Sequence, residues 1–219
     1  MKIVSLNVGR PRLIRWQGQT YSSSIFKDPV PGRVMLRRTN LDGDRQADLS
    51  VHGGPDKAVY AYPSEHYAYW RDFMALPSLP WGSFGENLTT EGLLETEIHV
   101  GDQFRLGSAT VMAKSPRTPC LKLAAKFGRD TMIKDFLHSS FSSFYFSVIE
   151  EGEIGAGDEF QFLGGETPTI SIAEVNHLYI SRASDLGLLE RATQVKSLPA
   201  GWRDHFQARL SAAAKQAAI

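Results

Sequence analysis

Residues 110–128 read TVMAKSPRTPCLKLAAKFG, and this stretch predicts a strand that runs directly into a helix. Thr110–Lys114 is prone to β-structure, whereas Leu121–Phe127 is typical of a helix that ends at Gly128. Two prolines restrict the backbone between these elements. Cys120 therefore lies at a strand-to-helix junction, where a rigid sheet commonly carries functional side chains.

Cys120 is the only cysteine in the chain, and a cation flanks it on each side, Arg117 and Lys122. A helix N-terminus and nearby cations both favour the thiolate form of a cysteine. The alternative is an inert, buried cysteine that only fills the core. An inert cysteine needs neither rigid prolines nor flanking charges, so the pattern favours a thiolate with a chemical role.

The bulk composition excludes several classes of partner. The 219 residues contain 24 Lys and Arg against 24 Asp and Glu, a balance that does not favour binding to nucleic acid or to an anionic membrane. A single cysteine forbids an internal disulfide framework. Met1–Val8 alternates like a strand and lacks the apolar run of a signal peptide. No apolar run approaches the roughly 20 residues of a membrane helix. We therefore expect a cytoplasmic protein.

The first two thirds of the chain predict an α+β fold that is mainly β. Gly101–Leu106 (GDQFRL) is similar to Gly157–Phe162 (GDEFQF), each a Gly-Asp turn followed by a short alternating strand. This repeat suggests two similar hairpin edges of a closed or half-closed barrel. A helix is expected from Pro63, with Tyr67 and Trp70 on its buried face. Helices are therefore expected as insertions in a strand-rich unit.

The composition changes after residue 164, where GGETP reads as a linker. Ser171 and Glu174 form a capping-box pattern, and three short helical segments follow it. Such a short bundle has a weak core by itself and is expected to dock on the barrel or on a partner. We therefore predict a barrel-like domain over residues 1–165 and a three-helix domain over residues 166–219.

Familiar catalytic signatures are absent from the sequence. It contains no Walker A sequence, no GxGxxG between a strand and a helix, no HExxH and no GxSxG. Four polar clusters remain, namely Ser24 with Lys27, His52–Lys57 (HGGPDK), Gly85–Asn87 (GEN), and Arg117 with Cys120. The cations suit a phosphate or pyrophosphate, and a thiolate suits a polarisable metal.

The polar clusters belong to a set of ordered motifs that resembles the MOSC domain, found at the C-terminus of molybdenum cofactor sulfurases. These motifs are DGD (42–44), ADL (47–49), HGGPDKAVY (52–60) with YP (62–63), FGENL (84–88) and PRTPCLKL (116–123). The helical tail is similar to that of the stand-alone, bacterial YiiM-like members. The resemblance covers nearly the whole chain.

The resemblance implies a β-barrel-like fold that binds the molybdenum cofactor, with Cys120 as thiolate ligand of molybdenum. Lys27, Lys57 and Arg117 are then expected to contact phosphate and pterin oxygens, and Asn87 to hydrogen-bond the pterin edge. His52 is expected either to orient the cofactor or to relay a proton.

YiiM-like proteins are associated with the reduction of N-hydroxylated compounds, including hydroxylaminopurines, a detoxification of modified bases. The electrons come from a separate flavoprotein reductase. The sequence has no flavin, nicotinamide or iron–sulfur motif of its own, in agreement with an external electron donor. Two other functions stay open: a sulfur carrier with a persulfide on Cys120, or a non-catalytic cofactor-binding module. The chain is expected to be a monomer or a homodimer.

Overall fold

The computed structural model describes residues 1–47, 53–181 and 185–217 of the chain. The strands are β1 (Lys2–Val8), β2 (Arg12–Trp16), β3 (Gln19–Ser23), β4 (Asp28–Pro29), β5 (Arg33–Leu36), β6 (Val59–Pro63), β7 (Leu88–Glu91), β8 (Gln103–Leu106), β9 (Ala109–Pro116), β10 (Phe144–Glu150), β11 (Gly152–Gly155) and β12 (Phe160–Gly164). The helices are the 3₁₀ turn η1 (Pro55–Lys57), α1 (His66–Phe73), α2 (Leu121–Phe127), α3 (Met132–Ser139), α4 (Ile172–Ile180), α5 (Leu186–Gln194) and α6 (Ala200–Ala217). This mixture confirms the predicted α+β class.

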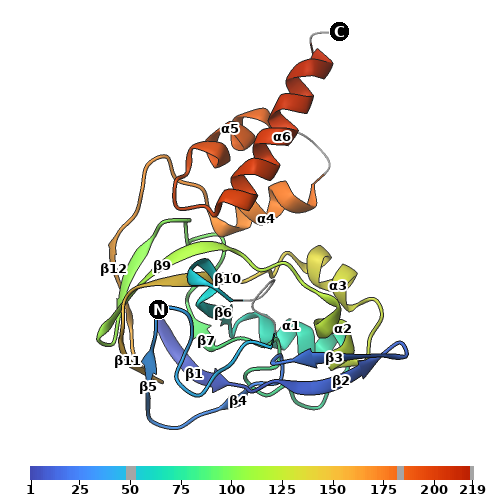
Figure 1. Cartoon of the computed structure of the whole chain (residues 1–219), viewed down its shortest axis with the longest axis vertical. Coiled ribbons are helices and arrows are strands. Elements are labelled where there is room, and N and C mark those ends of the chain that lie inside the picture. Colours follow the sequence, from blue (N-terminus) through green and yellow to red (C-terminus); the bar gives the residue numbers. More distant parts are fainter. Residues whose placement is uncertain (48–52, 182–184, 218–219) are drawn as a thin grey trace.

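Eight strands form the main sheet, in the order β12-β8-β9-β10-β6-β7-β1-β4. β6 and β7 are parallel, and the other neighbouring pairs are antiparallel. An isolated bridge between Lys2 and Glu159 brings β1 next to the turn before β12. There the Ile3 amide donates to the Asp158 carbonyl oxygen at 2.9 Å. The sheet thus curls into a barrel-like shape without a continuous closing ladder among the described strands (Figure 1).

The two similar Gly-Asp segments form neighbouring strands rather than separate edges of the barrel. β12 pairs antiparallel with β8, and Phe162 lies opposite Phe104 in the register. β12 is the end strand of the sheet, whereas β8 lies inside it. The sequence similarity predicts the two turns and strands correctly, but it contains no information on which strands pair.

Two hydrophobic clusters fill the molecule. The first lies along the sheet and includes an aromatic group, Phe104, Phe144, Phe146 and Phe160. The second lies among α1, α2 and α3 and contains Tyr62, Trp70, Phe84, Met132 and Phe136. In Figure 1 these three helices lie together on one side of the sheet, near the hairpin of β2 and β3. The second cluster supports the strand-to-helix junction that contains Cys120.

Helix α1 begins at His66 instead of Pro63, so the predicted start of this helix is wrong. Pro63 is the last residue of β6 and pairs with Thr90 of the parallel strand β7. Sheet pairing therefore overrides the preference of proline for the first turn of a helix. The predicted buried face is confirmed, because Tyr67 and Trp70 are buried.

The C-terminal helices dock on the sheet. The predicted capping box is present, because the Ser171 hydroxyl accepts from the Glu174 amide while the Glu174 carboxylate accepts from the Ser171 amide. The Val100 amide donates to the Ile170 carbonyl oxygen at 2.9 Å, and α4 packs against β9. The predicted boundary at residues 165 and 166 falls between β12 and α4, but the first hydrophobic cluster continues across it into α4, α5 and α6.

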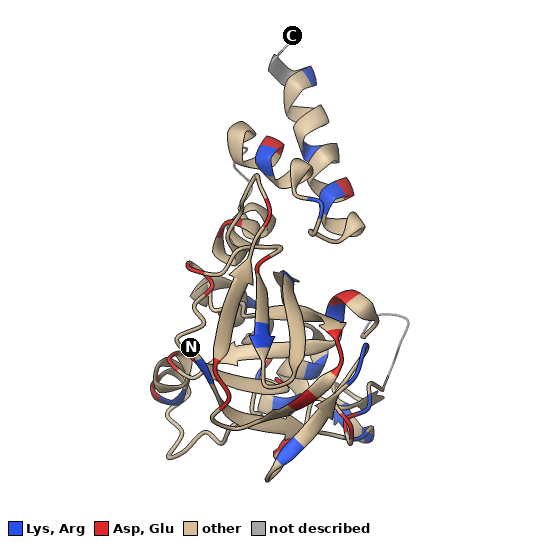
Figure 2. Ribbon diagram, turned by 90° about the vertical axis from the view of Figure 1, so that its left-hand side faces the viewer, with Lys and Arg blue, Asp and Glu red and all other residues tan. Residues whose placement is uncertain are grey.

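In the view of Figure 2, acidic and basic residues are interspersed along the ribbon, in keeping with the equal numbers of the two kinds of charge. None of the helices in the described ranges is both long enough and apolar enough to cross a bilayer.

The aromatic group of the sheet generates a first prediction. Phe146 is fully buried and contacts the rings of Phe104, Phe144 and Phe160, so Phe146→Ala should lower the free energy of unfolding by about 3–5 kcal/mol. Phe162 is a matched control, since it touches Phe104 but is 59% exposed. Phe162→Ala should cost less than about 1 kcal/mol. Urea denaturation measures both, and equal losses would contradict the assignment of the core.

Candidate functional site

Cys120 lies where the sequence predicts it, between the end of β9 and the start of α2. Its backbone is extended, with φ −129° and ψ 170°, and it is the N-cap residue of the helix. α2 runs from Leu121 to Phe127 and ends at Gly128 in the left-handed conformation, which confirms the predicted bounds. Cys120 is half-buried and lines a pocket.

A pocket opens beside Cys120, with a volume of about 650 Å³ including its mouth. It brings together the predicted site residues Lys27, Lys57, Asn87, Arg117 and Cys120. The other predicted site residue, His52, lies outside the described residues. The remaining lining residues are Ser23, Ser24, Ile25, Asp44, Arg45, Gln46, Ala47, Gly53, Tyr60, Gly85, Lys122 and Tyr145.

The pocket has a strongly positive lining. Among the described residues, five basic side chains line it (Lys27, Arg45, Lys57, Arg117 and Lys122), against one carboxylate, Asp44. The chain as a whole has no net charge, so this excess is local. Such a lining attracts an anion.

Ser24 adds an unsatisfied polar group to the lining. Its Oγ is buried and has no hydrogen-bond partner among the described residues. A buried hydroxyl without a hydrogen-bond partner destabilises the folded protein by on the order of 1–3 kcal/mol. A bound anion would give this hydroxyl an acceptor, so Ser24 is suited to contact a ligand.

Lys27 is held by a buried ion pair with Asp44. The Nζ atom lies 2.5 Å from Asp44 Oδ1, and the two side chains are 8% and 3% exposed. Burial lowers the pKa of Lys27 below its ordinary value, although the Asp44 carboxylate acts in the opposite direction. Asp44 Oδ1 also accepts from the Gly9 amide at 2.7 Å. The ammonium of Lys27 is thus fixed at the wall of the pocket.

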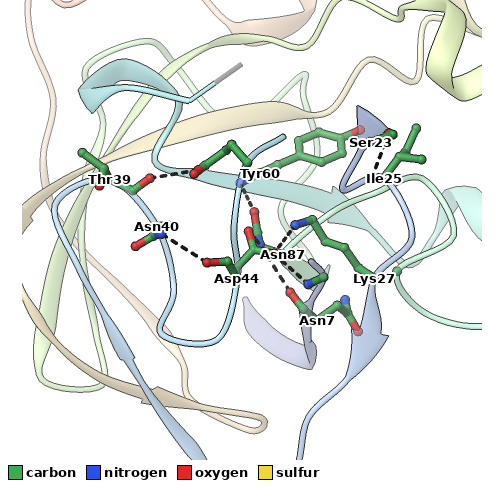
Figure 3. A network of polar contacts seen from close by, with 12 residues as sticks. Asn7, Ser23, Ile25, Lys27, Thr39, Asn40, Asp44, Tyr60 and Asn87 are labelled. Atoms are coloured by element: carbon green, nitrogen blue, oxygen red, sulfur yellow. Dashed lines mark hydrogen bonds and ion pairs between the residues drawn. The ribbon is translucent and has the colours of Figure 1, made fainter. Parts of the chain in front are cut away.

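Asn87 is buried, and its amide group is used inside the protein. Its Nδ2 donates to Asp44 Oδ2 at 2.9 Å and to the Asn7 carbonyl oxygen at 3.3 Å. Its Oδ1 accepts from the Tyr60 amide at 3.3 Å. Figure 3 shows how Lys27, Asp44 and Asn87 point toward one another. This geometry assigns Asn87 a role in holding Asp44, in place of the expected donor for the edge of a heterocycle.

Glu86 organises the loop before β7. It is fully buried, and its Oε1 accepts from the Gly82 amide at 2.8 Å while Oε2 accepts from the Phe84 amide at 3.0 Å. The hydroxyls of Tyr67 and Thr89 also donate to Oε1. The GEN motif therefore combines two structural functions, since Glu86 shapes its own loop and Asn87 joins that loop to Asp44.

Arg117 is buried beside two tyrosines of the pocket. Its Nη1 donates to Tyr60 Oη at 3.2 Å and to the Phe84 carbonyl oxygen at 3.0 Å. Burial alone would lower the pKa of Arg117, but Tyr60, Tyr145 and Cys120 outweigh it and hold the pKa above its ordinary value. Burial raises the pKa of Tyr60 and Tyr145. Arg117 is thus a permanent cation beside the thiol.

Gly53 and Gly54 bring the η1 turn to the pocket. Both have positive φ, 99° and 86°, which a residue with a side chain rarely adopts. Lys57, at the end of η1, lines the pocket together with Gly53. Asp56 faces away and pairs with Lys114 at 3.1 Å. The HGGPDK motif therefore contributes one cation and close backbone to the site.

Three residues that line the pocket were not predicted as site residues, namely Asp44, Tyr60 and Tyr145. Asp44 and Tyr60 belong to the ordered motifs DGD and HGGPDKAVY, but the sequence assigned them no role in a site. Alternation along a strand could have identified the tyrosines as facing one side, but not which side faces a pocket. Among the described residues, no three His, Cys, Asp or Glu side chains gather to hold a metal ion.

Comparisons with known proteins identify the two parts of the chain. The family model of the MOSC domain matches residues 48–161, and that of the "YiiM-like, 3-alpha helix domain" matches residues 170–213. Protein YiiM of Escherichia coli is 35% identical over 193 residues, which cover 87% of this chain and 78% of YiiM. A protein of Gibberella moniliformis named "Reductase" is 32% identical over 181 residues, 81% of this chain and 32% of that protein.

A crystal structure has the same fold. The structure of YiiM from Geobacillus stearothermophilus superposes with a TM-score of 0.79 at 34% sequence identity, covering 95% of this chain and 98% of that chain.

The Lys27–Asp44 pair generates the second prediction. Asp44→Asn leaves a buried ammonium without its counter-charge and should lower the free energy of unfolding by about 3 kcal/mol. Lys27→Met in the same chain removes that ammonium, so the double variant should recover part of the loss. Urea denaturation of the two variants and of Lys27→Met measures the coupling. A double variant as unstable as the sum of the single ones would contradict the ion pair.

Proposed function

The chain belongs to the MOSC domain family, and from this premise we propose that it is a molybdenum-cofactor-dependent oxidoreductase that reduces N-hydroxylated compounds to amines. Hydroxylaminopurines are the substrates we expect. Family membership and the reductase-named relative support the general, oxidoreductase-like role. The substrate, the cofactor and the electron donor are the proposed part.

The residues of the pocket fit the molybdenum cofactor. Cys120 provides a soft sulfur ligand, which suits a polarisable metal. The cations around it suit the phosphate of the cofactor, and the partnerless hydroxyl of Ser24 provides a further donor. The observation that carries the proposal is this combination: one half-buried thiol opens onto the same pocket as five cations and an unsatisfied hydroxyl.

When bound, the cofactor supplies the two-electron redox chemistry at molybdenum. The overall reaction consumes a hydroxylamine (R–NHOH), two electrons and two protons, and yields an amine (R–NH₂) and water. The N–O bond breaks, the nitrogen is reduced, and the oxygen leaves as water. The electrons are proposed to come from a separate flavoprotein reductase.

The side chains of the pocket would have different roles in binding the cofactor. Cys120 would hold the metal through its thiolate, and Lys27, Lys57 and Arg117 would hold anionic oxygens. Because Arg117 cannot lose its proton, it keeps a cation next to the thiolate at every working pH. The raised pKa of Tyr60 and of Tyr145 keeps both phenols protonated. The Tyr60 hydroxyl accepts from Arg117 Nη1 and from Ser143 Oγ, which fixes it beside the guanidinium.

The third prediction concerns Cys120. Cys120→Ser replaces the soft thiolate by a hard hydroxyl, so the reduction of an N-hydroxylated purine by a competent reductase system should fall by at least about 100-fold. Wild type and Cys120→Ser are both purified from cells that make the cofactor, and their molybdenum content and turnover are compared. Retained turnover would remove Cys120 from the reaction. Wild-type protein that holds a persulfide but no molybdenum would instead support a sulfur carrier. Wild-type protein that binds the cofactor without turnover would support a non-catalytic binding module.

The fourth prediction concerns Lys57. Lys57→Ala should weaken cofactor retention by about tenfold, because a charge-assisted hydrogen bond contributes on the order of 1.5 kcal/mol. Turnover per bound molybdenum should change much less. Lys196→Ala is the control, since Lys196 is exposed in the C-terminal helical region. If turnover per bound metal falls while retention is unchanged, Lys57 takes part in the chemistry instead.

A further inference from the structure

Helix α2 also carries Lys126, a half-buried residue six positions after Cys120. Its Nζ donates to the Ile25 carbonyl oxygen at 2.9 Å and to the Gly82 carbonyl oxygen at 2.8 Å. The two acceptors belong to different loops, and neither loop is adjacent to α2 in the sequence. One ammonium therefore joins three separate segments of the chain.

The two loops meet backbone to backbone at this point. A Cβ atom on Gly82 would lie 2.7 Å from the Lys27 carbonyl oxygen, and one on Gly85 would lie 2.9 Å from Ile25 Cγ1. Both glycines have positive φ, 82° and 81°. Because neither glycine has a side chain, the two loops pack closely, and the carbonyl groups of Ile25 and Gly82 share one ammonium.

Each of the three segments contributes to the pocket. The loop at Ile25 carries the partnerless Ser24 hydroxyl and Lys27, and the loop at Gly82 leads to Gly85 and Asn87. α2 begins directly after Cys120. Lys126 thus lies where a displacement of one loop would change the position of the anion-binding groups relative to the thiol.

The groups around Lys126 have opposing effects on the pKa of its ammonium. Burial lowers the pKa of Lys126 to about 8, Glu86 opposes the shift, and Arg117, Arg12 and Lys27 add to it. The ammonium also lies 5.5 Å from the ring of Phe26. Burying an ammonium costs free energy, and an apolar side chain could fill the same volume without that cost. A requirement for the two hydrogen bonds explains why a charged group is there.

We propose that Lys126 is a positioning residue, which holds helix α2 to the loops at Ile25 and Gly82. The thiol of Cys120 then keeps a fixed position relative to the anion-binding side chains on these loops. The identity of the anion as the phosphate of the molybdenum cofactor rests on the proposed function. The positioning role of Lys126 rests only on the contacts of Lys126. The positioning role and the proposed function can therefore fail separately.

The single cysteine permits a test without molybdenum. The rate at which iodoacetamide alkylates Cys120 is measured in the purified full-length chain, with increasing inorganic pyrophosphate at constant ionic strength. Pyrophosphate in the pocket should protect Cys120 in the wild type. In Lys126→Met, the concentration for half-protection should rise about tenfold, because the loops no longer hold the anion-binding groups in place.

Two variants serve as controls. Lys134→Met removes an exposed lysine of α3 and should leave the protection curve unchanged. Lys126→Arg keeps a cation that can donate to both carbonyl oxygens, and its half-protection concentration should stay within about threefold of the wild type. Wild-type protection in a folded Lys126→Met protein would overturn the proposal.

The pH dependence gives an independent test if Lys126→Met fails to fold. The charge of Lys126 is fully present well below pH 8 and is lost as the pH rises through about 8. Protection of the wild type should therefore weaken by about fivefold from pH 7 to pH 9. In Lys126→Arg the same rise in pH should weaken it clearly less, since arginine stays charged. Equal losses in the two proteins would overturn the proposal, whereas missing molybdenum in the wild type would contradict only the proposed function.

Discussion

The buried carboxylate of Asp44 is the interaction on which the pocket depends. It receives the ammonium of Lys27, the backbone amide of Gly9 and the side-chain amide of Asn87. Asn87 in turn holds the backbone of Asn7 and Tyr60. The free energy of burying this charge is recovered only when all partners are present, because each lost donor leaves part of the carboxylate unsatisfied. Asp44 therefore makes the folding of β1, β6, and the loops at Lys27 and Asn87 interdependent.

The pocket combines groups of different chemical character. A soft thiol, hard cations and a hydroxyl line the same cavity. The aromatic cluster around Phe84 and Trp70 packs beside the site, where Arg117 is buried. In such surroundings hydrogen bonds to charged groups are stronger than in water, so a few residues suffice to fix a large anion. In the proposed function the fold supplies position and charge, and the bound cofactor would supply the redox chemistry.

Local patterns predicted the local features of this protein. The helix at residues 121–127, its end at Gly128 and the capping box at Ser171 follow from short-range rules, and the structure has them at those positions. The start of α1 did not follow, because pairing of Pro63 with Thr90 is a long-range contact. The pairing of β8 with β12 is also long-range, and sequence similarity between two strands does not reveal it.

The site itself was predictable in residue type but not in detailed role. Lys27, Lys57, Arg117 and Cys120 line one pocket, as expected from their charges and from the ordered motifs. Asn87 differs, since only the fold reveals that its donors and its acceptor are used within the protein. Lys126 looks like an ordinary lysine of a helix, and its two carbonyl partners come from loops about 100 and 44 residues away. No local pattern contains that information.

We propose that Cys120 binds molybdenum in this pocket. X-ray absorption at the molybdenum edge tests this binding, on wild-type and Cys120→Ser protein purified from cells that make the cofactor. We expect a sulfur shell around molybdenum in the wild type that loses one sulfur atom in the variant. Identical sulfur shells in both proteins, or no molybdenum in the folded wild type, would contradict it.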